Sequence, residues 1–222
     1  SELGEWEQAL EAAQKSIEQF RLSLSRPNPH PEDLRNLIFA KYRLARIMES
    51  LQRYPEASRA YDDAITEIET AIQSHGLTRY KFELVRTLTW SAELHSQPQT
   101  SEESTNSQIP IDIEKASQQI ERATTLLGTV TAESGQAIRL YHAEALKVQG
   151  QVQWMSGNLV EAKKSLDLVI EQLGALIAES DASYYNQHLA ESRFLLARVY
   201  RSEGNEQRFQ ELGRSALESM HY

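Results

Sequence analysis

Residues 44–64 read LARIMESLQRYPEASRAYDDA, a stretch in which small and large side chains alternate at helical spacing. Small residues stand at Ala45, Ala57 and Ala64, and large ones at Tyr54 and Tyr61. Apolar residues recur every three or four positions on both sides of a short turn at 54–56, which is typical of two amphipathic helices. Antiparallel helices approach closely only where small side chains lie at their crossing. The stretch therefore predicts a tightly packed helix pair.

The same arrangement recurs along the chain, which indicates an internal repeat. One later copy contains Gly150, Gly157, Leu159, Ala162, Leu166 and Val169. The last copy contains Leu196, Ala197, Tyr200, Gly204, Phe209, Gly213 and Ala216. A looser copy has Ala92 in its first helix and Ala116, Ile120 and Ala123 in its second. The chain opens within the second helix of a further pair, where we expect Trp6 to pack against the end of that pair. Four full pairs and a leading half-pair are predicted, the last with altered packing because Phe209 and Gly213 exchange large and small positions.

A helix pair cannot bury its apolar face alone, so neighbouring pairs stack into a continuous core. These residues resemble the tetratricopeptide repeat (TPR), which has Leu-Gly/Ala and then Tyr on its first helix, and Ala, Phe/Tyr and Ala on its second. The resemblance covers most of the chain and implies an all-α, TPR-like α-solenoid of antiparallel helix pairs. A generic α-helical bundle or a 14-3-3-like array is the alternative fold.

Besides the exchange of Phe209 and Gly213, two features depart from the TPR pattern. The proline that ends the second helix is missing, and the repeats are long. The markers Ala9, Ala57, Ala116, Ala162 and Phe209 lie 48, 59, 46 and 47 positions apart, against about 34 in TPR proteins. Longer helices explain this spacing, with an inserted loop in the second pair.

Turn residues between the periodic segments predict about nine helices. They cover residues 5–25, 32–52, 55–75, 78–96, 111–128, 134–156, 159–178, 182–203 and 205–221. We expect a single TPR-like domain over 1–222 and a polar, mobile loop at 97–110, a tract rich in Ser, Thr and Gln. Because the chain starts at Ser1 inside a helix, without an initiator Met, we expect it to be part of a longer protein.

Composition excludes several classes of function. The net charge of −9 argues against nucleic-acid binding and against docking on anionic membranes. The chain has no cysteine, so disulfides and thiolate metal sites are excluded. No transmembrane run or signal peptide is evident, and we expect a cytoplasmic protein.

No motif for catalysis is present. The chain has no glycine-rich phosphate loop, no nucleophile elbow and no kinase catalytic loop. Its six histidines are never four residues apart, which excludes the H-E-x-x-H zinc helix. His142-Ala143-Glu144 matches the H-x-E of zinc deaminases only superficially, because their P-C-x-x-C is missing. We expect no enzyme activity, no metal and no cofactor.

The TPR resemblance implies a concave groove lined by the first helix of each pair, where members bind peptides. The matching positions are Arg43, Arg46, Glu49, Arg86, Glu93, Lys147, Gln151, Trp154, Phe194, Arg198 and Arg201. Cations dominate this set although the whole chain is acidic. Guanidinium groups bind carboxylates through paired hydrogen bonds, so an acidic peptide or a C-terminal carboxylate is the expected ligand. The alternative is that these cations pair locally, as Arg46 could with Glu49, Arg198 with Glu191 and Arg201 with Glu203.

Three functions remain open at this stage. The first is a non-catalytic scaffold that binds a protein segment in the groove. The second is a regulatory or oligomerising segment of a larger bacterial signalling enzyme, such as a Ser/Thr kinase. The third is self-association into a homo-oligomer through exposed end helices. Trp90 is expected in the core, whereas Trp154 fits the core and the groove equally well.

Overall fold

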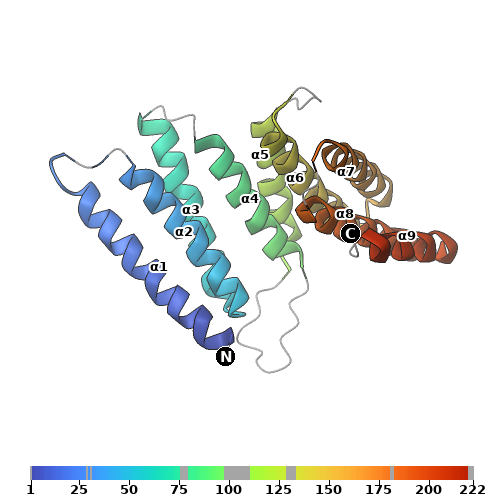
Figure 1. The fold of residues 1–222 in the computed structure, drawn as a ribbon, viewed down its shortest axis with the longest axis horizontal. Helices are drawn as coiled ribbons and strands as arrows, with labels where there is room; N and C mark the ends of the chain where they lie inside the picture. Colours follow the sequence, from blue (N-terminus) through green and yellow to red (C-terminus); the bar gives the residue numbers. More distant parts are fainter. Residues whose placement is uncertain are drawn as a thin grey trace. The chain divides into compact units, whose positions relative to one another are not determined.

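The structure is a computed structural model that describes residues 2–28, 30, 32–75, 80–97, 111–128, 134–180 and 183–219. Over these ranges it is all-α, with nine helices and no strand (Figure 1). The helices are α1 (Glu2–Leu24), α2 (Asp33–Ser50), α3 (Tyr54–His75), α4 (Lys81–Ser96), α5 (Ile113–Leu127), α6 (Gln136–Met155), α7 (Leu159–Glu179), α8 (Ser183–Ser202) and α9 (Glu206–Ser219).

The all-α prediction is confirmed, and the predicted helix ends agree with the observed ones to within a few residues. Helical periodicity and turn residues are local features, so they locate helices without knowledge of packing. The loop predicted at 97–110 falls, apart from Gln97, outside the described residues.

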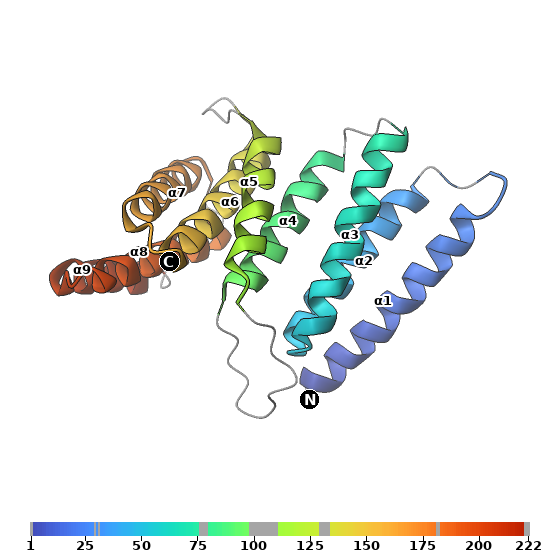
Figure 2. The same ribbon diagram turned by 180° about the vertical axis from the view of Figure 1, so that it is seen from behind.

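The chain divides into two compact units, Ser1–Ile111 and Asp112–Tyr222. In the first unit each helix packs on the next, from α1 to α4 (Figures 1 and 2). One buried cluster joins all four helices, through Leu10 of α1, Ala45 of α2, Tyr61 of α3 and Leu94 of α4. The core of this unit therefore holds α2 and α3 between their two neighbours.

The second unit contains α5 to α9, again packed in chain order, and α6 also contacts α8. Leu146, Leu173 and Leu189 belong to one buried cluster shared by α6, α7 and α8. A second cluster, with Leu166 and Leu196, continues towards α9 through Leu212. The helices α6 and α8 thus lie on the same side of α7.

Three of the connecting turns share one geometry. The backbone N–H groups of Arg53, Asn158 and Asn205 donate to the carbonyls of Met48, Gln153 and Tyr200, at 2.8, 2.8 and 3.0 Å. The residue before each donor has positive φ, at Gln52 (57°), Gly157 (80°) and Gly204 (78°). This is the Schellman helix end, in which a left-handed residue closes the last turn. It makes α2–α3, α6–α7 and α8–α9 three equivalent antiparallel pairs.

The small residues that precede these turns, Ala45, Gly150 and Ala197, stand at one common offset from them and are buried. After the turn, Ala57 and Ala162 are fully buried, whereas Phe209 at the equivalent position is only partly buried. The altered packing predicted for the last pair is therefore observed.

The packing role predicted for Trp6 is wrong. Trp6 is 41% exposed. Its helix, α1, packs chiefly against α2, so the outer face of α1 stays open to solvent in the described part of the chain.

Candidate functional site

The first candidate site is a face of α2 and α4 in the first unit. Tyr42, Arg46 and Glu49 lie on α2 at intervals of four and three residues, and Arg86, Trp90 and Glu93 repeat that spacing on α4. Such intervals place three side chains on one face of a helix. Because both helices pack on α3, the two rows of side chains lie beside each other. We call these six residues the α2/α4 face.

Aromatic rings and guanidinium groups alternate across the α2/α4 face. The centroids of the Tyr42 and Trp90 rings are 5.5 Å apart. The Arg46 and Arg86 guanidinium carbons lie 5.2 and 4.7 Å from the Trp90 centroid, and Arg86 is 5.3 Å from that of Tyr42. These distances suit cation–π contact, which orders both guanidinium groups without consuming their hydrogen-bond donors.

A partly buried hydrogen-bond network supports this arrangement from below. Arg46 Nη1 donates to Glu49 Oε2 at 3.1 Å, and the Tyr61 hydroxyl of α3 donates to the same oxygen at 2.9 Å. The Glu49 side chain is 22% exposed and that of Arg46 is 46% exposed. Burial raises the pKa of the Glu49 carboxyl, although Arg46 and Tyr61 oppose that shift. The cation of this pair therefore faces the solvent while the carboxylate lies beneath it.

The second unit carries a related face on α6 and α8. The Arg198 guanidinium lies 4.6 Å from the Trp154 ring centroid, and the indole N–H of Trp154 donates to Ser202 Oγ at 2.9 Å. Lys147 Nζ donates to Glu191 Oε2 at 2.8 Å across the two helices. Burial on its own would raise the pKa of Glu191, but Lys147, Gln187 and His188 together outweigh it and the pKa is lowered.

The structure tests the local pairing considered for these cations. Arg46 does pair with Glu49. Glu191, however, pairs with Lys147 and not with Arg198, and Glu203 pairs with Lys163 of α7 and not with Arg201. Glu191 and Glu203 thus each pair with a lysine of another helix, whereas Glu49 pairs along its own helix.

The remaining predicted groove residues lie apart from these contacts. Arg43 is exposed on α2, and no ion pair among the described residues includes it. Phe194 is 52% exposed on α8. Gln151 is partly buried on α6, and the Arg201 guanidinium lies 5.0 Å from the Phe209 ring of α9. Arg201 therefore packs towards α9.

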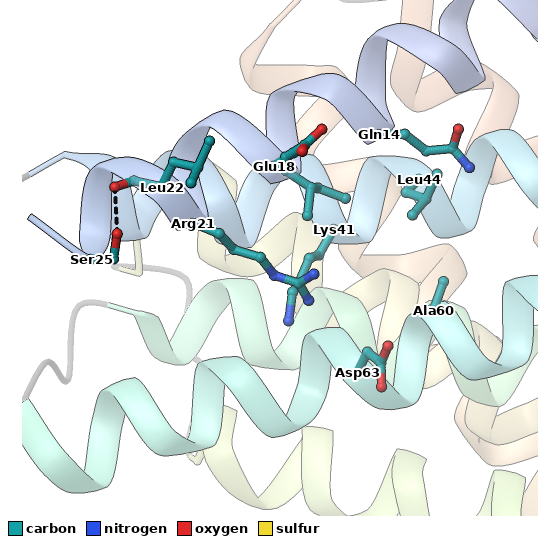
Figure 3. Close-up of a pocket in the computed structure, with 10 residues that line it drawn as sticks. Gln14, Glu18, Arg21, Leu22, Ser25, Lys41, Leu44, Ala60 and Asp63 are labelled. Carbon is teal, nitrogen blue, oxygen red and sulfur yellow. Dashed lines mark hydrogen bonds between the residues drawn. The ribbon is translucent and has the colours of Figure 1, made fainter.

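A cavity that the sequence did not reveal lies in the first unit (Figure 3). Its volume is about 660 Å³, which is within the range of small-molecule sites. It lies between α1 and α3, with α2 forming its floor. Apolar side chains at Ile17, Leu22, Leu44 and Ala60 and charged ones at Glu18, Arg21, Lys41 and Asp63 line it, together with Gln14 and Ser25.

Lys41 is the least expected lining residue. It is 7% exposed and lies among apolar positions of α2 such as Leu37 and Ala45. Its ammonium donates to Glu67 of α3 at 2.5 Å. A lysine on the apolar stripe of an amphipathic helix was visible in the sequence and is the signal that could have indicated this site.

Neither a metal centre nor a membrane helix is found in the described ranges. They hold no group of three acidic or histidine side chains placed to bind a metal ion. None of their helices combines the length and apolar character needed to cross a bilayer.

No model of a known protein family matches the chain, and no curated protein matches it significantly.

Proposed function

We propose that this chain is a non-catalytic protein-interaction scaffold, a TPR-like α-solenoid that holds an acidic protein segment on its alternate helices. The turn shared by α2–α3, α6–α7 and α8–α9 supports the repeat. The common offset of Ala45, Gly150 and Ala197 from that turn supports it as well. In this proposal the segment lies on α2 and α4 of the first unit, and α6 and α8 of the second unit carry a related contact.

One observation carries the proposal, namely that Trp90 has a guanidinium group over its ring from each of two helices. Stacking on an aromatic ring restrains an arginine without using its five N–H donors, one of which Arg46 gives to Glu49. Less side-chain entropy is then lost on binding. The Arg198–Trp154 contact has the same geometry in the second unit.

Binding of matched peptides tests this proposal. Labelled peptides of one length would carry Glu, Gln or Lys at alternate positions, with a free or an amidated C-terminus, and fluorescence anisotropy would measure their affinities. We expect the Glu peptides to bind more tightly than the Gln peptides, and the Lys peptides not to bind. A free C-terminus should strengthen binding, because it adds a carboxylate.

Substitutions on the α2/α4 face locate the contact. The double variant Arg46→Gln/Arg86→Gln should weaken binding of the Glu peptide at least about tenfold, since a hydrogen bond to a charged group contributes about 1.5–3 kcal/mol. Arg46→Lys should weaken it less, because lysine keeps the charge but not the planar fork. Arg59→Gln, an exposed arginine of α3, is the matched control and should leave the affinity unchanged.

Circular dichroism would verify that each variant is folded. Equal affinity for the Glu and Gln peptides, or equal weakening by Arg59→Gln, would refute the proposal.

A further inference from the structure

The cavity between α1 and α3 has two chemically different ends. Near Gln14 of α1 it is bounded by Leu44 of α2 and Ala60 of α3, and Ile17 lies further along the same wall. Towards the C-terminal end of α1 lie Arg21 and Lys41. Figure 3 shows both of these side chains extending from their helices towards α3. The lining is therefore apolar around Leu44 and Ala60, whereas Arg21 and Lys41 lie towards the other end, where Leu22 and Ser25 also line the cavity.

The cations have donor capacity that their described contacts leave unused. An ammonium group has three donors, and the described contacts of the Lys41 ammonium comprise one hydrogen bond, to Glu67. The Arg21 side chain takes part in no ion pair or hydrogen bond among the described residues, although a guanidinium has five donors. Lys41 is buried, so water screens its charge weakly, and its ion pair with Glu67 offsets part of the attraction that an anion in the cavity would feel.

Two carboxylates limit the charge of the ligand. Glu18 and Asp63 line the same cavity and are exposed, so solvent screens them more than it screens Lys41. Figure 3 shows the Glu18 carboxylate beside α1 and Asp63 on α3. A second negative charge on the ligand would lie among these groups and be repelled. An anion with one charged head and one apolar tail fits both ends.

We propose that this cavity binds an amphipathic monoanion, of which a medium-chain carboxylate is the simplest example. The carboxylate accepts hydrogen bonds from Arg21 and Lys41, and the alkyl chain packs on Ile17, Leu44 and Ala60. The site uses α1, α2 and α3 and none of the six residues of the α2/α4 face. It is therefore independent of the peptide-binding proposal.

Titration with decanoate tests the site in the intact chain. Its binding would be measured by calorimetry below the concentration at which it forms micelles, and located by amide shifts in NMR spectra of the labelled protein. Methyl decanoate removes the charge, decylammonium reverses it and sebacate adds a second carboxylate. We expect saturable binding of decanoate alone among these probes, with shifts centred on α1 to α3.

Two substitutions at exposed positions probe the two ends without disturbing the core. Arg21→Gln should weaken decanoate binding about tenfold or more, the effect of losing charge-assisted hydrogen bonds. Gln14→Trp should reduce it by filling the apolar end. Arg46→Gln, on the α2/α4 face, should leave it unchanged, and Arg21→Gln should in turn leave binding of the Glu peptide unchanged.

The proposal is overturned if methyl decanoate or sebacate binds as tightly as decanoate, or if no saturable binding occurs. It is also overturned if Arg21→Gln, shown by circular dichroism to be folded, binds decanoate with unaltered affinity. Loss of peptide binding in Arg46→Gln with decanoate binding retained separates the two proposals.

Discussion

At the scale of single residues, Gly150 shows how closely the helices of one pair approach. A Cβ atom added there would lie 2.7 Å from Cγ of Leu166 and 3.0 Å from its Cδ2. Leu166 is fully buried, and it would have to shift to accommodate that atom. The small residue predicted at this crossing of α6 and α7 is therefore required by the backbone separation.

Replacing this glycine should destabilise the protein. Gly150→Ala adds an overpacking cost of about 1–3 kcal/mol, which the better helix propensity of alanine offsets by about 1 kcal/mol. We expect a net loss of about 1 kcal/mol in the free energy of unfolding, measured by urea denaturation. Gly174→Ala is the matched control on α7, because an added Cβ there meets no atom within 4 Å. Gly174→Ala should stabilise the protein by up to about 1 kcal/mol. Equal stabilisation by both substitutions would contradict the close contact at Gly150.

At the scale of elements, the repeated turn sets the geometry of the helix pairs. Gly157 and Gly204 occupy the left-handed position in two of the turns, but Gln52 occupies it in the third, at φ 57°. A side chain makes this conformation unfavourable because Cβ approaches the following carbonyl oxygen. The α2–α3 turn therefore contains strain that its two equivalents avoid.

Introducing glycine should relieve that strain. Gln52→Gly is expected to raise the free energy of unfolding by about 0.5–1 kcal/mol. The substitution removes the cost of the left-handed conformation, but glycine has more conformational entropy in the unfolded chain, which offsets part of that gain. Gly157→Ala should lower it by a similar amount. Thermal unfolding monitored by circular dichroism would measure both changes. A loss of stability in Gln52→Gly would show that the glutamine side chain contributes a contact worth more than the strain.

At the scale of the whole molecule, the chain consists of two units with separate cores. Leu10, Ala45 and Leu94 belong to the core of the first unit, and Leu166 and Leu196 to that of the second. Local opening in a protein follows such cooperative units. Each proposed binding site in the first unit is built from residues of that unit alone.

Hydrogen exchange can test whether the units respond separately. In Gly150→Ala we expect faster amide exchange in α5 to α9 and unchanged exchange in α1 to α4. Mass spectrometry of peptides from the exchanged protein would measure both. Decanoate affinity should also stay unchanged in this variant. Faster exchange throughout both units would instead indicate a single cooperative structure.

The candidate site was predictable only in part. Helical spacing in the sequence is enough to place Tyr42, Arg46 and Glu49 on one face of α2. Their association with Trp90 depends on how α2 and α4 both pack on α3, which no local pattern specifies. The same reason explains why the sequence offered Arg198, on the same helix, as a partner of Glu191, which pairs with Lys147 of α6.

The sequence by itself determined the helices, their ends and the small residues at their crossings, beginning with the pair in 44–64. These features depend on interactions between residues close in the chain, namely periodic burial, turn chemistry and backbone sterics. Tertiary structure alone decided the exposure of Trp6, the stacking of Arg46 and Arg86 on Trp90, and the cavity that Lys41 lines. Each of these depends on how separate helices are placed relative to one another, because a cavity or a cross-helix contact exists only once the elements that form it are packed together.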